Sequence, residues 1–257
     1  MNMISFKGRN NILQNADRIT RKVNSVYPHI SESKSKDYIS KVIEFSDFNS
    51  DVSKKMMNLS FRNAVKLDAL RFRMPSGIEL FKSIIYALKD KHIGNCYESA
   101  RLAEIIAKIN GQDNVYSMKT YVARNRSGME IKLEHVVSVM TNQPIEAGKK
   151  YIFKNKDAVI IDPWFGITDF ASKYVERLKN DFMHHFMYMP NNNLVSRMIS
   201  KQAKTPQEYN ALKKEKFFNP PIRFLLHEDD VLTKEQAKEL RDEYPELILD
   251  DFKKIDF

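Results

Sequence analysis

The chain has 257 residues, 42% of them hydrophobic and 29% charged, which is the composition of a folded globular protein rather than of a disordered one. Its length allows one sizeable core, or one main domain with a small appendage. The single cysteine excludes an internal disulfide framework and any zinc site built from several cysteines.

Charge is unevenly distributed along the chain, whose formal net charge is +9. Residues 228–257 hold eleven Asp and Glu against five Lys and Arg, so the rest of the chain is strongly basic. A solvated, lysine-rich surface is the simplest explanation, and docking on an acidic protein or an anionic membrane surface is the alternative. The sequence contains no nucleic-acid recognition motif, so we expect no nucleic-acid partner.

No segment of the sequence is predicted to cross a membrane or to direct export. No stretch approaches the roughly 18 apolar residues that a transmembrane helix needs. Residues 1–7 contain no apolar run of signal-peptide length. We therefore expect a protein that is made in a cytoplasm and is not exported by a cleaved signal peptide.

The pattern of breakers predicts three regions, which could equally form one continuous domain. Residues 1–75 are polar and helical in character, and they end at a Pro-Ser-Gly breaker. Residues 76–170 carry the patterned core. Residues 171–257 are predicted to be a helical C-terminal region with an acidic tail, in which Thr233 and Gln236 form a capping-box pattern.

The central region changes from helical to strand character along its length. Helices are predicted over residues 78–91 and 96–109, and the second is closed by an Asn-Gly pair. Strands are predicted over residues 115–123, 132–140 and 158–161. Helices followed by antiparallel strands predict an α+β domain in which a central helix packs on a small antiparallel sheet.

Cys96 stands at the predicted start of the long helix, directly after Gly94 and Asn95. A helix N-terminus presents backbone N–H groups and a partial positive charge, which stabilise a thiolate and also an oxyanion formed at an attacked carbonyl. Gly94 permits close approach of backbone to substrate, and Asn95 is a candidate oxyanion donor. The alternative is that Cys96 is a small buried hydrophobe.

Two polar residues of the predicted sheet complete a catalytic pattern. His135 lies in mid-strand, in phase with Val137 and Val139, so we expect it to point into the core and to need a partner. Asp162 ends a buried apolar strand, where a carboxylate is costly unless paired. We predict a general base at His135, oriented by Asp162. A core histidine and a strand-ending Asx turn are the alternatives.

Other polar and aromatic residues have weaker claims. His92 precedes Cys96 by four residues and could be the base, although a cation near the end of the preceding helix is the preferred interpretation. His184 and His185 lack carboxylates at metal-ligand spacing, so no metal site is predicted. Trp164, directly after the Asp-Pro corner, is a candidate to shield the Asp–His pair or to line the acyl site, with core packing as the alternative.

Three segments resemble the papain/transglutaminase-like superfamily of cysteine enzymes: residues 94–100, 134–137 and 160–166. The resemblance covers about residues 78–170. It implies a fold in which the nucleophilic cysteine starts a central helix and the histidine and aspartate follow on adjacent strands. The residues that match these roles here are Cys96, His135 and Asp162.

Within that superfamily the chain looks most like secreted bacterial effectors and toxins, which include glutamine deamidases and small cysteine proteases. This resemblance implies a protein substrate in a host cell and secretion from a bacterial cytoplasm. Papain-type proteases carry a glutamine a few residues before the cysteine, which is absent here, so backbone N–H groups or Asn95 must stabilise the oxyanion. Arylamine N-acetyltransferases share a related pattern, but the interval from His135 to Asp162 is too long for them.

The function predicted from these observations is cysteine-dependent acyl transfer on protein carboxamide or peptide bonds, by deamidation, transamidation or proteolysis. The reaction needs no metal or organic cofactor. The rival hypothesis is a non-catalytic binding module that keeps the fold and docks through its basic surface.

Overall fold

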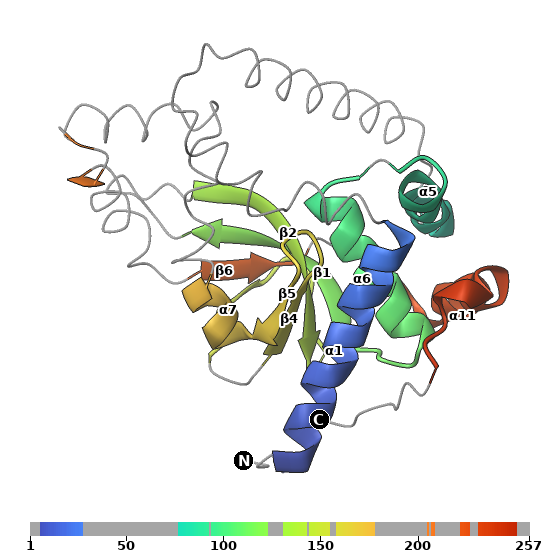
Figure 1. Ribbon diagram of the computed structural model, residues 1–257, viewed down its shortest axis with the longest axis horizontal. Coiled ribbons are helices and arrows are strands. Elements are labelled where there is room, and N and C mark those ends of the chain that lie inside the picture. The colour runs from blue at the N-terminus through green and yellow to red at the C-terminus, as the bar shows by residue number, and fades with distance from the viewer. Residues whose placement is uncertain are drawn as a thin grey trace.

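The computed structural model describes residues 6–27, 77–92, 94–122, 131–142, 144–154, 158–177, 205, 207–208, 222–226 and 231–250. These residues form one six-stranded antiparallel sheet with helices packed on it (Figure 1). The mixed architecture confirms the predicted α+β class.

The sheet has the strand order β3-β6-β1-β2-β4-β5, and every pairing between neighbours is antiparallel. The strands β1, β2, β4 and β5 are neighbours in chain order, with only the short edge strand β3 intervening between β2 and β4 along the chain, so most of the sheet is an antiparallel meander. The strands are β1 (Val115–Val122), β2 (Ile131–Thr141), β3 (Lys150–Tyr151), β4 (Ala158–Asp162), β5 (Ile167–Phe170) and β6 (Ile222–Leu225).

Helices pack on both faces of the sheet, and Figure 1 shows most of them gathered on one side, with α7 across the sheet from them. Helix α6 contacts β1, β2 and β4 directly, and α1, α5 and α11 pack against α6. The helices are α1 (Phe6–Val26), α5 (Ile78–Lys89), α6 (Cys96–Ile109), α7 (Ala171–Arg177) and α11 (Lys234–Glu243), followed by the 3₁₀ turn η3 (Pro245–Leu247).

Alternation along the strands divides the buried apolar side chains between two cores. In β2, Val139 belongs to the core beside α7, whereas Met140 belongs to the core beside α6. The core beside α6 also takes side chains from α1 and from the C-terminal helix α11, including Ile19 and Leu240. Described parts of all three predicted regions therefore share one hydrophobic core.

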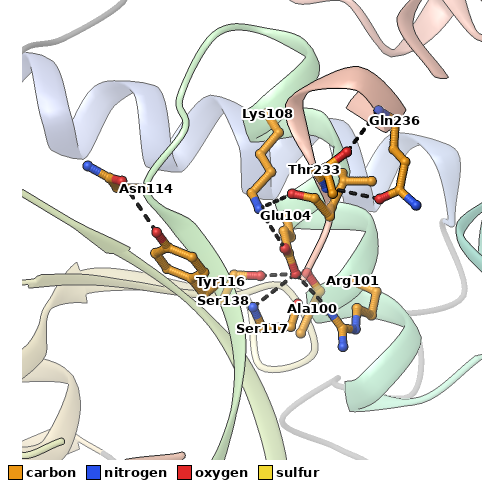
Figure 2. A network of polar contacts seen from close by, with 11 residues as sticks. Ala100, Arg101, Glu104, Lys108, Asn114, Tyr116, Ser117, Ser138, Thr233 and Gln236 are labelled. Atoms are coloured by element: carbon orange, nitrogen blue, oxygen red, sulfur yellow. Dashed lines mark hydrogen bonds and ion pairs between the residues drawn. The ribbon is translucent and has the colours of Figure 1, made fainter. Parts of the chain in front are cut away.

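Helix α6 is the central helix of the fold, and its residues from Glu98 to Ile109 are all buried. Burial extends to its charged side chains, which pair with one another: Glu104 lies 2.9 Å from Arg101 and 3.1 Å from Lys108. Glu104 also accepts a hydrogen bond from the backbone N–H of Ser117 in β1 (Figure 2). This network ties the helix to the sheet, because a buried carboxylate is tolerated only when its oxygens are paired.

The same network joins the C-terminal segment to the central helix. Lys108 Nζ donates a hydrogen bond of 2.6 Å to the carbonyl oxygen of Leu232, just before α11. Within α11, Glu239 and Glu243 pair with Lys82 of α5, at 3.0 Å and 2.7 Å. Part of the acidic C-terminal sequence is thus neutralised by lysines of the same chain.

The strand and helix boundaries show where the sequence-based prediction was incomplete. The predicted strand at residues 158–161 continues to Asp162, and the region predicted to be helical beyond residue 171 also contributes strand β6. Strand β5, which pairs with β4, was not predicted. Strand β3 was not predicted either. The three missed strands have two to four residues, too few to show a period of two clearly. Among the described residues, no helix is both long and apolar enough to cross a membrane.

Candidate active site

Cys96 is the first residue of helix α6, and its side chain is half-buried. The helix starts there because Asn95 and Glu98 form a capping box. Asn95 Oδ1 accepts from the N–H of Tyr97 at 2.8 Å, and Glu98 Oε2 accepts from the N–H of Asn95 at 3.0 Å. The cap fixes the direction in which the helix, and with it the thiol, enters the site.

Asn95 and Gly94, which were predicted to contribute to oxyanion or substrate binding, also have structural roles. The Oδ1 atom of Asn95 serves the helix cap, so an oxyanion would depend on its amide hydrogens or on backbone N–H groups. A Cβ atom added to Gly94 would lie 2.2 Å from Cδ2 of Leu88, a buried residue of α5. Gly94 is therefore required for packing of the loop on α5, whatever its role toward a substrate.

The N-terminal helix α1 and the residue that follows it also contact the loop before Cys96. Tyr27, the buried residue after α1, donates a hydrogen bond of 3.4 Å to the carbonyl oxygen of Gly94. Thr20 of the same helix lies 2.6 Å, oxygen to oxygen, from Thr168 of β5. Helix α1 thus spans from the cysteine loop to the edge strand beside Asp162.

His135 lies in β2 with its side chain 1% exposed, as expected from its phase with Val137 and Val139. Its Nε2 atom lies 2.8 Å from Oδ2 of Asp162. The backbone of the residue is held as well, since Thr120 of β1 donates to its carbonyl oxygen at 2.9 Å. With Nε2 directed at Asp162, Nδ1 is the ring nitrogen that can serve the thiol of Cys96, to which the ring is also hydrogen-bonded.

Asp162 ends β4 and is fully buried. Antiparallel pairing of β2 with β4 sets Ile161 opposite Ser138, which brings the end of β4 level with the middle of β2. Asp162 Oδ2 accepts from His135, and Oδ1 accepts from the backbone N–H of Phe165 at 3.1 Å. The structure therefore brings Cys96, His135 and Asp162 together, although they are far apart in the sequence.

The electrostatics of the site favour a protonated imidazole. Burial by itself lowers the pKa of His135, but the charge and hydrogen bond of Asp162, with a smaller contribution from Cys96, outweigh it and raise the pKa from 6.5 to about 10. At neutral pH His135 is then an imidazolium in contact with both a carboxylate and a thiol. That arrangement provides a counter-ion for a thiolate and a proton donor for a leaving group.

Cys96, His135 and Asp162 are called the triad below. Two residues that the sequence did not single out contact it. The ring of Phe165 lies against His135, with 5.0 Å between ring centroids. Trp164, the aromatic residue considered from the sequence, is half-buried, as Phe165 is. Tyr174 of α7 donates a hydrogen bond of 2.8 Å to Asp162 Oδ2. Phe165 lies in the turn after Asp162, so its position near the Asp162–His135 pair could have been predicted from the sequence. Tyr174 carries no local signal, because its contact depends on how α7 packs on the sheet.

Of the other histidines considered as candidates, His92 lies within the described residues. His92 is exposed and has a positive backbone φ of 51°, while His135 is the histidine that bonds Asp162. His184 and His185 lie outside the described residues. Within the described part of the chain, no group of three or more His, Cys, Asp or Glu side chains is arranged to hold a metal ion.

Comparisons with protein-family models, with curated proteins and with solved structures find no match for this chain. Inference about its function therefore depends on the geometry of the site and on general chemistry.

Proposed function

We propose that this chain is a cysteine-dependent acyl-transfer enzyme with a papain/transglutaminase-like fold, in which Cys96 is the nucleophile, His135 the acid–base group and Asp162 its orienting partner. The observation that carries the proposal is the buried His135 ring, which bonds Asp162 at 2.8 Å on one side and Cys96 on the other. A histidine buried for packing alone would need one partner, not a carboxylate and the only thiol in the chain.

The proposed reaction divides amide cleavage into two easier steps. The sulfur of Cys96 attacks the amide carbonyl carbon, the carbon–nitrogen bond breaks, and His135 gives its proton to the departing amine. Water then attacks the thioester while His135 takes up one of its protons, which releases a carboxylic acid and regenerates the sulfur of Cys96 as a thiolate beside protonated His135. A glutamine side chain releases ammonia, a peptide bond releases a new amino terminus, and an amine in place of water gives transamidation.

The proposed substrate is a protein carboxamide or peptide bond. A host-cell protein as the target, and secretion as a bacterial effector, remain predictions from the resemblance of residues 94–100, 134–137 and 160–166 to that superfamily. The oxyanion of the proposed reaction would be stabilised by backbone N–H groups at the start of α6, where the helix dipole also favours negative charge.

The reactivity of the single cysteine tests the nucleophile, because any thiol label reports on Cys96 alone. At pH 6.5 an ordinary cysteine is only about 1% ionised. In the proposed mechanism the imidazolium of His135 is the counter-ion of the attacking sulfur, and the thiolate is the form of cysteine that reacts with the label. We expect iodoacetamide to label native protein at least tenfold faster than the same protein unfolded in urea, as measured by mass spectrometry.

Two histidine variants serve as test and control. His135→Gln should reduce the labelling rate of folded protein to that of unfolded chain or below. His92→Gln, which changes an exposed histidine four residues before the cysteine, should leave the rate unchanged. Equal labelling of wild type and His135→Gln would contradict the proposal and favour the non-catalytic binding module.

Product analysis tests the reaction itself. Wild-type protein and Cys96→Ala are incubated with a host-cell protein mixture, and the products are compared by mass spectrometry. Deamidation adds about one mass unit to a glutamine, whereas proteolysis creates a new chain terminus. We expect one of these changes with wild type and neither with Cys96→Ala. Identical products from the two proteins would rule out acyl transfer on the proteins supplied.

A further inference from the structure

We propose that Tyr174 is a positioning residue of the triad, which holds the Asp162 carboxylate in place and takes up part of the negative charge that Asp162 directs at His135. The inference rests on the proposed function and deepens it, because it concerns a residue outside the cysteine–histidine–aspartate pattern.

The geometry places two donors on one oxygen atom. Tyr174 Oη and His135 Nε2 both lie 2.8 Å from Asp162 Oδ2. The other carboxylate oxygen accepts from the N–H of Phe165, so donors from three elements fix the carboxylate. With both oxygens bonded, rotation of the Asp162 side chain would break at least one hydrogen bond to a charged group.

Burial of the Tyr174 hydroxyl is energetically unfavourable unless the hydroxyl forms a hydrogen bond. The side chain is 0% exposed and lies in the core beside α7, among apolar residues such as Val137 and Ile160. A phenylalanine would fill nearly the same volume without burying a polar group. Burial, together with the charge of Asp162, raises the pKa of Tyr174 well above 10, so the phenol remains a hydrogen-bond donor at neutral pH.

Charge sharing sets the direction of the expected effect. A hydrogen bond to a carboxylate stabilises its charged form and weakens the attraction that the carboxylate exerts on a second donor. Loss of the Tyr174 hydroxyl should therefore strengthen the attraction between Asp162 and the His135 proton and raise the pKa of His135. A stronger hydrogen-bond donor at position 174 should weaken this attraction and lower the pKa of His135.

Titration of the His135 ring tests the inference directly. The ring carbon signal is followed by nuclear magnetic resonance in protein with labelled histidine, and it is assigned by its disappearance in His135→Gln. Tyr174→Phe should move the midpoint upward by about 0.5 to 1 pH unit. The hydrogen bond from Tyr174 stabilises the charged carboxylate, and only part of that free energy changes the interaction between Asp162 and the His135 proton. The titration needs no substrate.

Two further proteins make the outcome decisive. Replacing Tyr174 with 3-fluorotyrosine keeps the shape and makes the phenol a stronger donor, so the midpoint should move downward even if Tyr174→Phe does not fold. Tyr116→Phe is the matched control, because Tyr116 is a buried tyrosine of the same core whose hydroxyl bonds Asn114 at 3.3 Å. It should leave the midpoint unchanged.

A midpoint in Tyr174→Phe equal to that of Tyr116→Phe, or an upward shift with 3-fluorotyrosine, would overturn the inference. Its failure is distinguishable from failure of the proposed function. If Cys96 of wild-type protein is not labelled faster than unfolded chain, the proposed function fails. If that labelling is fast and the His135 midpoint does not respond to position 174, only the role of Tyr174 is refuted.

Discussion

Asp162→Asn is expected to slow substrate turnover by a factor on the order of 10²–10⁴, the range seen when a general base loses its orienting group. Asparagine keeps the shape of the side chain, but it carries no charge, and its single carbonyl oxygen cannot accept from both Tyr174 and Phe165, which bond different oxygens of Asp162. Burial then dominates the environment of His135, lowers its pKa, and removes the positive charge beside Cys96 on which the proposed mechanism depends.

The same change should appear in the thiol. Labelling of Cys96 by iodoacetamide at pH 6.5 should fall in Asp162→Asn to the rate measured for His135→Gln. Asp169→Asn is the matched control, because Asp169 belongs to the adjacent strand β5 and caps the N–H of Phe170 instead of bonding the triad. A labelling rate in Asp162→Asn equal to that of Asp169→Asn would show that the carboxylate at 162 does not set the state of His135.

The raised pKa of His135 also predicts a pH-dependent stability, which is best measured in the Cys96→Ser background so that no thiol titrates. Between pH 6.5 and the folded-state pKa, the folded protein binds a proton at His135 that the unfolded chain does not. This contribution to stability is complete below pH 6.5 and is lost as the pH rises. Urea unfolding should show a slope from this group of at most about −1.4 kcal/mol per pH unit, absent when Asp162→Asn is added.

Glu104→Gln is expected to destabilise the fold by about 3–5 kcal/mol, the usual effect of removing one partner from a buried ion pair. Burial raises the pKa of Glu104, but the charges of Arg101 and Lys108 outweigh it and hold the pKa below 4.5. Glutamine would leave two cations in the centre of the protein without a counter-charge, and Figure 2 shows how closely both approach this carboxylate.

Urea unfolding followed by circular dichroism measures this effect as a lower midpoint at unchanged slope. Glu246→Gln is the control, because it removes an ion pair with Lys89 in which both side chains are more than 40% exposed, and such pairs contribute about 1 kcal/mol or less. The contribution of Glu104 should be present above pH 4.5 and lost as the pH falls through its folded-state pKa. Equal effects of the two substitutions would refute the structural importance of the buried network.

Much of the central region was predictable because its signals are local. The helix predicted over residues 96–109 has those bounds in the structure. The strand predicted over 115–123 is one residue longer than β1, and the strand predicted over 132–140 is one residue shorter than β2 at each end. Each depends on capping, periodicity or breakers within a few residues. The α+β class follows from their order.

Strand β6 was not predictable from such signals. Residues 222–225 pair with β1 and β3, which lie about 75 to 100 residues earlier in the chain. Their burial and backbone hydrogen bonds exist only once these distant segments meet, and four residues carry too little pattern to announce a strand. Tyr174 was missed for the same reason, since its partner Asp162 is reached through packing of α7.

The sequence by itself determined which residues could supply nucleophile, base and orienter, because chemical type and local conformation are written in neighbouring residues: Cys96 after a helix cap, His135 in phase with valines, Asp162 at the end of an apolar run. Only the tertiary structure decided that these side chains meet, and that Tyr174, Phe165 and Gly94 support them. The reason is physical, since hydrogen bonds across a buried site form between atoms brought together by strand register and helix packing, which no local pattern specifies.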